Sequence, residues 1–227
     1  MPAPLTIVIP TLNAGAALGG CAQALMAGLQ AGLIRGMVVS DGGSCDETVA
    51  VAEALGAVVV TGAPGRGGQI ARGVAAGNSD WVLILHVDTW LGDGWVAAVE
   101  AHMAAHPDCA GWFRLAFRAR GFAPGFVAGW ANLRARAGLP YGDQGLLIRR
   151  DLLASVGGVP DLPLMEDVAL ARALSGRLRG LGAVAHTSAE RYTTGGWLRR
   201  GARNLWTLAR YFAGVPPERL ARGYHRR

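Results

Sequence analysis

The sequence predicts an α/β fold with a mostly parallel central sheet flanked by helices, followed by a C-terminal amphipathic helical segment. Between residues 5 and 91, short runs rich in branched apolar residues alternate with longer alanine- and leucine-rich stretches. The links between them are short and contain glycine. Polar residues follow the apolar runs directly, and parallel strands would bring them to one edge of the sheet. These observations indicate a nucleotide-binding domain.

The first half supplies four expected strands, at residues 5–9, 37–40, 57–60 and 81–89. Three helices are expected between them, at residues 16–31, 46–55 and 69–77. In the second half, strands are expected at residues 112–117, 146–148 and 182–185, the first of them antiparallel to its neighbours. Further helices are expected at residues 95–105, 126–137 and 151–156, and from the acid pair at 166 and 167 to residue 175. This order is typical of right-handed βαβ units with an irregular second half.

Composition favours one main domain, because the chain has 227 residues, of which 51% are apolar and 17% charged. We place this domain at residues 1–190 and an arginine-rich helical segment at residues 191–227. All 22 basic residues are arginine, the formal net charge is +6, and nine arginines fall in the second of these ranges. Such a segment favours an anionic partner (a membrane surface, a nucleotide or nucleic acid) or forms a solvated face.

Within this segment, residues 197–214 predict an amphipathic helix. Its apolar side chains are Trp197, Leu198, Leu205, Trp206, Leu208, Ala209 and Phe212. Its arginines, opposite or flanking, are Arg199, Arg200, Arg203 and Arg210. Three uses remain open: the helix covers its own domain, lies on an anionic membrane, or packs in an oligomer.

The three cysteines show no paired spacing, so neither a disulfide framework nor a zinc site is expected, and a reducing compartment is indicated. The sequence shows no signal peptide and no apolar run of the roughly 18 residues that a membrane span requires. We therefore expect a cytoplasmic protein, with attachment to the inner face of the cell membrane as a further expectation.

Three residues in the first half suit a nucleotide diphosphate. Asp41 follows the second strand and Asp88 the fourth, and Arg66 lies in a glycine-rich loop before a helix. A carboxylate can anchor a divalent metal, and an arginine near a helix N-terminus can bind phosphate. Helix or turn capping is the alternative role for Asp88. The lysine phosphate loop GxxxxGKS/T and the dinucleotide motif GxGxxG are both missing, which disfavours an ordinary NTPase and NAD binding.

In the second half, Glu166 and Asp167 form an acid pair at an expected helix N-terminus. A carboxylate held there can act as general base towards an incoming hydroxyl, or can simply cap the first turn.

Taken together, these stretches resemble the family 2 glycosyltransferases of the GT-A fold. The matching segments are TIVIPTLNAG (6–15), VVSDGGSCDET (38–48), GRGGQIARG (65–73), LILHVDTWL (83–91), GDQGLLIRRD (142–151) and PDLPLMEDVAL (160–170). The LHxDT, GDQG and LMED motifs are closest to a small bacterial subgroup associated with radical-SAM/selenodomain proteins or arsenosugar synthesis. The resemblance implies an inverting transfer from a nucleotide-diphosphate sugar, commonly a UDP-sugar, assisted by Mg²⁺ or Mn²⁺.

The resemblance also implies site residues. The nucleotide-sugar would be bound by Pro10, Thr11, Asn13, Asp41, Arg66, Gln69, His86 and Val87. Asp167 would be the catalytic base, with Glu166 beside it, and Asp88 would bind the metal. The donor-sugar and acceptor pocket would be shaped by Gly142, Asp143 and Gln144.

Three departures from the family pattern stand out. His86 replaces the first acid of the DxD motif, and Ala14 replaces an acid common after the first strand. For the family's C-terminal histidine ligand, His186 and His225 are the candidates. The expected partners are the donor and a small-molecule or lipid-linked acceptor; no nucleic acid is expected, and an oligomer is left open. The alternative is a catalytically silent nucleotide-binding domain that docks on a membrane or partner.

Overall fold

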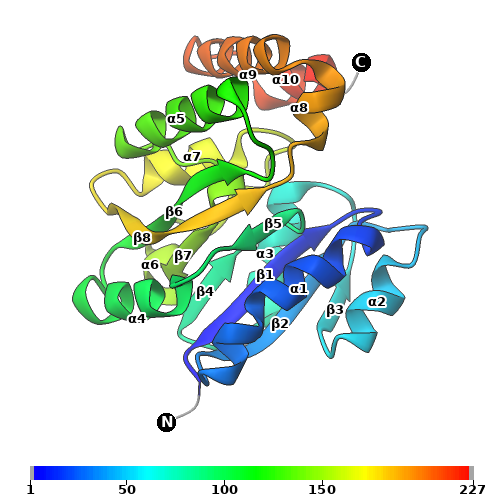
Figure 1. Ribbon diagram of the computed structural model, residues 1–227, viewed down its shortest axis with the longest axis vertical. Coiled ribbons are helices and arrows are strands. Elements are labelled where there is room, and N and C mark those ends of the chain that lie inside the picture. Colours follow the sequence, from blue (N-terminus) through cyan, green and yellow to red (C-terminus); the bar gives the residue numbers. More distant parts are fainter. Residues whose placement is uncertain (1–2, 225–227) are drawn as a thin grey trace.

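A computed structural model describes residues 3–224 (Figure 1). Its strands are β1 (Leu5–Thr11), β2 (Ile34–Asp41), β3 (Val58–Thr61), β4 (Trp81–Ile84), β5 (Thr89–Leu91), β6 (Ala110–Phe117), β7 (Leu146–Arg149) and β8 (Leu178–Thr187). Its α-helices are α1 (Gly15–Gln30), α2 (Thr48–Ala54), α3 (Arg66–Ala76), α4 (Trp95–Ala105), α5 (Phe122–Arg136), α6 (Arg150–Ser155), α7 (Glu166–Ala173), α8 (Glu190–Gly195), α9 (Trp197–Phe212) and α10 (Pro217–Tyr224). A short 3₁₀ helix, η1, covers Gly142–Gln144.

The eight strands form one mixed sheet in the order β3-β2-β1-β4-β7-β6-β8-β5. The first four in this order run parallel, which confirms the expected βαβ half. Thr11 of β1 pairs with Asp41 of β2, so the carboxyl ends of these strands lie at the same edge. That edge is where an open α/β sheet binds ligands.

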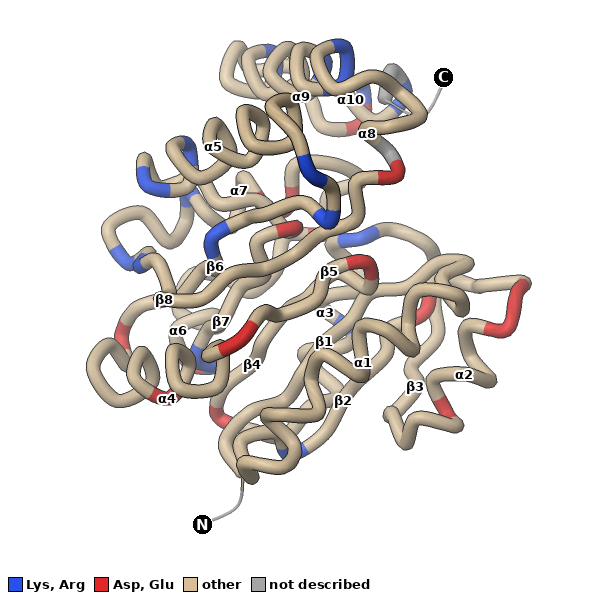
Figure 2. Tube along the Cα trace, in the orientation of Figure 1, with Lys and Arg blue, Asp and Glu red and all other residues tan. Residues whose placement is uncertain are grey.

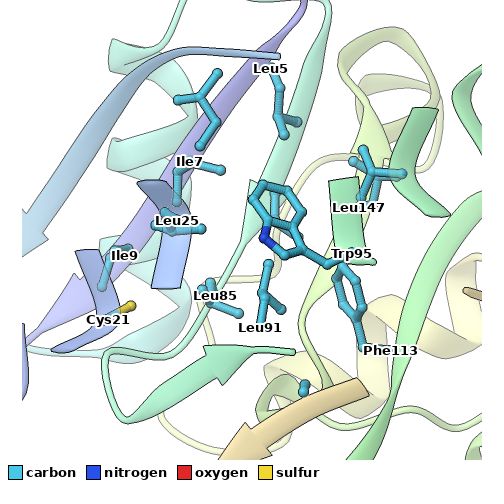
Figure 3. Packing of buried hydrophobic residues seen from close by; sticks show 14 of the residues in the cluster. Leu5, Ile7, Ile9, Cys21, Leu25, Leu85, Leu91, Trp95, Phe113 and Leu147 are labelled. Carbon is cyan, nitrogen blue, oxygen red and sulfur yellow. The ribbon is translucent and has the colours of Figure 1, made fainter. Parts of the chain in front are cut away.

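Helices cover both faces of the sheet because the strands are apolar on both sides. On one face, α1 and α4 pack against β1, with the indole of Trp95 in the middle of the cluster next to Phe113 (Figure 3). On the other face, Ile70 of α3 packs against Val8 of β1. The sheet is therefore held from both sides, and loops at its carboxyl edge stand on a rigid base.

From β4 onwards, the observed elements differ from the expected ones. The single strand expected at 81–89 is divided, because the chain turns after Ile84 and the Thr89 N–H donates to the His86 carbonyl at 3.0 Å. Residues 89–91 then pair with β8 as the separate strand β5. The expected strand at 182–185 is the ten-residue β8, and β6 is antiparallel to β7 but parallel to β8. Helices α8 and α10 were not expected.

The C-terminal helices lie at the same end of the molecule as α5 and α7 (Figure 1). Leu220 and Ala221 of α10 pack against Leu164, Met165 and Val168 around the start of α7. The segment after residue 190 thus contacts the main domain. The boundary between 1–190 and 191–227 stays a prediction. Within residues 3–224, no helix has the length and apolarity to cross a bilayer.

Candidate active site

A cleft opens between the carboxyl edge of the sheet and the C-terminal helices. It is lined by Arg66, His86, Asp88, Phe117, Tyr141, Gly142, Asp143, Leu164, Met165, Asp167, Thr187, Ser188, Tyr192, Arg200, Asn204 and Thr207. The charged residues predicted at 66, 88 and 167 therefore meet in one place.

Asp88 is held at the cleft by its main chain. Its carbonyl accepts hydrogen bonds from the Ser188 N–H at 3.1 Å and from the Arg118 guanidinium at 3.3 Å. These bonds tie the turn after β4 to the loop after β8. The Asp88 side chain lines the cleft from this fixed position.

Asp167 lies in the first turn of α7, and two main-chain groups orient its carboxylate. The Gly142 N–H donates to Oδ2 at 3.0 Å, and the N–H of Val168 donates to Oδ1 at 2.8 Å. Met165, directly before the helix, has a φ of 67°, a left-handed conformation uncommon for a residue with a side chain. This turn places Asp167 on the cleft side of α7.

Glu166 lies away from the cleft lining and forms an ion pair with Arg66. Its side chain is 2% exposed; burial and the neighbouring Asp167 raise the pKa of its carboxyl, while Arg66 acts in the opposite sense. Burial alone would lower the pKa of Arg66, but Asp167, Glu166 and Asp143 raise it above its usual value. Arg66 therefore stays positively charged, and Glu166 positions it.

Asp41 organises the loop that follows β2. Its carboxylate accepts hydrogen bonds from the Thr11 hydroxyl at 3.0 Å, the Gly43 N–H at 2.8 Å and the Ser44 N–H at 2.7 Å. Burial would raise the pKa of this carboxyl, but the hydrogen bonds from Ser44, Gly43 and Thr11 hold it below its usual value. In this structure its oxygens bind the chain's own loop.

Comparison with known proteins gives the decisive observation. A family model described as glycosyl transferase family 2 matches residues 6–131. The chain belongs to this family. The protein is therefore a glycosyltransferase, and the resemblance found in the sequence is confirmed at the level of the family.

Solved structures show the same fold as this family 2 glycosyltransferase. Glucosyl-3-phosphoglycerate synthase from Mycobacterium tuberculosis, in complex with Mn²⁺ and UDP-glucose, has a TM-score of 0.57 at 22% identity over 81% of this chain and 69% of its own. The S. aureus protein TarS has a TM-score of 0.61 at 16% identity over 87% of this chain and 39% of its own. These structures confirm the GT-A fold. The comparison with curated proteins finds no match.

Several predicted site residues of this glycosyltransferase make contacts within the folded chain. The Gln69 amide donates to the carbonyls of Thr11 and Ser40, at 2.6 and 3.0 Å. The fully buried Gln144 donates to the Phe113 carbonyl at 3.1 Å. Val87 packs against the core. None of the three lines the cleft, and their predicted roles in binding the donor stay predictions.

Two other predicted nucleotide-binding residues lie beside the cleft without lining it. Pro10 is paired with Ser40 in the β1–β2 ladder. Asn13, with a φ of 50°, accepts a hydrogen bond on Oδ1 from the Cys45 N–H at 2.8 Å. Both residues belong to the edge next to Asp41.

Two histidines, His186 and His225, were the candidates for a metal ligand. A Cβ added at Gly92 would lie 3.0 Å from Nε2 of His186, so the His186 ring lies over β5. Thr187, the next residue, lines the cleft. Because successive side chains of a strand point to opposite faces, His186 and Thr187 lie on opposite faces of β8. The metal role of His186 stays a prediction. His225 lies outside the described residues.

Two residues of η1, Gly142 and Asp143, line the cleft. A Cβ at Gly142 would lie 2.6 Å from Nε2 of His86, so only glycine fits between the histidine ring and the cleft. Asp143 lines the cleft, and its Oδ1 is buried with no hydrogen-bond partner among the described residues. Burial, with Asp167 and Asp88 nearby, raises the pKa of Asp143 to about 6 against the opposing effect of Arg134 and Arg66.

Sequence reasoning missed the contribution of α9. Arg200, Asn204 and Thr207 line the cleft from that helix. Their spacing of four and three residues was a visible signal for one helix face. The signal was lost because the polar side of the amphipathic segment was taken to be flanking or solvated.

Proposed function

We propose that this glycosyltransferase transfers a sugar from a UDP-sugar to an acceptor hydroxyl in one displacement with inversion at the anomeric carbon. The observation that carries this proposal is that Arg66, Asp88 and Asp167, far apart in sequence, line one cleft. The Mn²⁺ and UDP-glucose complex of the mycobacterial synthase supports the choice of donor. Membership of the radical-SAM-associated subgroup stays a prediction that rests on the LHxDT, GDQG and LMED motifs.

Asp167 acts as the general base. A carboxylate oxygen has more than one acceptor position, so each Asp167 oxygen can accept a main-chain N–H and still take a proton. The acceptor hydroxyl loses its proton to Asp167 as its oxygen bonds to the anomeric carbon. The bond from that carbon to the β-phosphate oxygen breaks, and its electron pair leaves with the diphosphate. Arg66 stabilises the charge that develops there.

The buried Oδ1 of Asp143 faces the same reaction and has no partner among the described residues. We propose that this oxygen accepts a hydrogen bond from a sugar hydroxyl of the donor or from a hydroxyl of the acceptor. Arg200, Asn204 and Thr207 form the wall contributed by α9, and the acceptor approaches along this wall.

The donor set fits a hard divalent cation that keeps water and phosphate ligands. Among residues 3–224, no group of three or more His, Cys, Asp or Glu side chains could form a closed metal site. Mg²⁺ usually binds one or two carboxylates together with substrate phosphates, and Asp88 supplies such a carboxylate. When bound, Mg²⁺ or Mn²⁺ would neutralise the leaving diphosphate.

The proposal is tested by UDP release from a panel of UDP-sugars, with and without Mn²⁺. Asp167→Asn should lower turnover by about 10²–10⁴-fold while UDP binding persists, because the amide cannot accept the proton. Asp88→Ala should remove the metal dependence of UDP binding. Asp108→Asn, an exposed acid outside the cleft, serves as the control.

Unchanged turnover in Asp167→Asn would refute the assignment of the base. UDP binding without turnover of any donor would instead favour the catalytically silent nucleotide-binding domain.

A further inference from the structure

The helix α9 buries its polar side and exposes its apolar side, the reverse of an ordinary surface helix. Its exposed residues include Leu198, Leu205, Trp206, Ala209 and Phe212, which recur at the spacing of one helix face. Trp206 is 66% exposed. The opposite side, with Asn204 and Thr207, lines the cleft. Packing of α9 on its own domain therefore accounts for the polar side of the helix, but the exposed apolar side has no contact among the described residues that explains it.

The neighbouring helix α5 also exposes its large apolar side chains. Its exposed large side chains are Phe122, Phe126, Trp130 and Leu133, spaced four, four and three residues apart. Phe122 is 87% exposed, and its ring stacks on that of Phe126 with 6.1 Å between the centroids. Its buried side holds Ala128, Ala131 and Ala135, small residues that let the helix approach the sheet.

The two apolar sides meet at a second pocket. Trp130 of α5 and Leu205 of α9 line this pocket, which shares Tyr141 and Asp143 with the catalytic cleft. We call the exposed set the α5–α9 face; it consists of Phe122, Phe126, Trp130, Leu133, Leu198, Leu205, Trp206 and Phe212. This face adjoins a pocket that shares part of its wall with the catalytic cleft.

The charges around this face have one sign. The segments Phe122–Arg136 and Trp197–Phe212 contain arginines but neither contains an aspartate or glutamate. Of these arginines, Arg136 and Arg199 are exposed and Arg210 is partly exposed, whereas Arg134 is buried and Arg200 lines the cleft. In Figure 2 the α5 and α9 traces accordingly carry blue but no red. A second copy meeting this face across a two-fold axis would bring arginines against arginines, which disfavours a dimer here. An anionic surface complements both the apolar face and its arginines.

We propose that the α5–α9 face docks on the surface of a membrane rich in anionic phospholipid. The apolar side chains insert at the boundary between headgroups and acyl chains, and the flanking arginines bind the phosphate groups, as an interfacial amphipathic helix does. The second pocket then opens towards the lipid. This docking goes beyond the transfer reaction and does not depend on the identity of the donor.

Flotation of the full chain with vesicles tests this proposal. We expect binding to vesicles of phosphatidylcholine with phosphatidylglycerol, much weaker binding to phosphatidylcholine alone, and a decrease at high salt. Phe126→Ser/Trp206→Ser should weaken binding by about tenfold or more, since two aromatic side chains no longer leave water. Arg199→Gln/Arg210→Gln should weaken binding by about tenfold, because each arginine contributes attraction to the anionic surface.

Matched controls change the same kinds of residue elsewhere. Leu29→Ser/Leu55→Ser replaces two exposed leucines on α1 and after α2, and Arg35→Gln/Arg177→Gln replaces two exposed arginines outside the face. Both should bind vesicles like the unaltered protein, and circular dichroism verifies that each variant is folded. Binding that the face variants leave unchanged, or no binding to anionic vesicles, would overturn the proposal. A dimer in solution that Phe126→Ser/Trp206→Ser dissociates, without vesicle binding, would assign the face to a second copy instead.

Discussion

At the scale of single residues, Gly142 connects two parts of the reaction site. Its N–H donates to Oδ2 of Asp167 at 3.0 Å, and a Cβ in its place would lie 2.6 Å from Nε2 of His86. The residue therefore orients the proposed base and leaves no room for a side chain. A glycine is required here by close approach and not by an unusual φ.

Gly142→Ala should lower the transfer rate by about tenfold or more, because a displaced η1 shifts the carboxylate that takes the proton. The affinity for UDP should change little, since the proposed reaction places the base at the acceptor hydroxyl. Steady-state kinetics together with calorimetric UDP titration measure the two effects. Gly19→Ala on α1, where an added Cβ meets nothing within 4 Å, is the control and should keep full activity. A loss of UDP affinity equal to the loss of rate would contradict this role.

Some charged residues at strand and helix ends were predictable as cleft residues, and the contacts of buried amides were not. Asp88, Asp167 and Arg66 line the cleft, whereas Asp41, also at a strand end, binds its own loop. Gln69 lies in α3 and Gln144 in η1, and their amides bind main-chain carbonyls that only the folded chain brings near. Sequence position alone does not separate a side chain facing the cleft from one beneath it.

At the scale of elements, the N-terminus of α1 is satisfied by a neighbouring segment. Its N-cap, Ala14, has no side-chain acceptor, and the Ala14 N–H donates to Oγ1 of Thr48 at 2.7 Å. The Gly15 N–H donates to Oδ2 of Asp46 at 3.2 Å. The segment between β2 and α2 thus holds α1 in place.

Thr48→Val should lower the free energy of unfolding by about 1–3 kcal/mol, because the partly buried Ala14 N–H loses its acceptor while the side chain keeps its volume. Urea unfolding measures the change. Thr61→Val, an exposed threonine on β3, should stay within about 0.5 kcal/mol of the unaltered protein. Equal stability of the two variants would show that the Thr48 bond does not hold α1.

Elements with a continuous apolar or helical sequence pattern were predicted well. Strands that depend on pairing with a distant strand were not. The helix expected at 95–105 is α4, with the same bounds. The strand β5 has three residues and exists only because β8 lies beside it. The strand β8 was predicted too short, because Gly180 and Gly182 are residues uncommon in strands. In the structure Gly180 packs against the Trp112 ring, from which an added Cβ would lie 3.2 Å away. Which side of α9 faces inward depends on the cleft, which no local pattern reveals.

At the scale of the whole molecule, the site is assembled from both halves of the chain. The first half supplies Arg66 and Asp88, and the second supplies Asp143 and Asp167. Burial of the Asp143 carboxyl, together with the nearby carboxylates of Asp167 and Asp88, raises its pKa to about 6, because Arg134 and Arg66 offset only part of this effect. The substrate-free enzyme is therefore destabilised by the charges that its reaction requires.

This raised pKa predicts how stability depends on pH. The folded protein binds the Asp143 proton more tightly than the unfolded chain, whose carboxyl titrates near 3.8. The contribution of Asp143 to stability is therefore fully present below about pH 4 and is lost as the pH rises through about 6. Asp143→Asn should remove this loss, so its free energy of unfolding should rise relative to the unaltered protein between pH 4 and 6 and then level off. Urea unfolding without metal measures both curves, and parallel curves across this window would refute the raised pKa of Asp143.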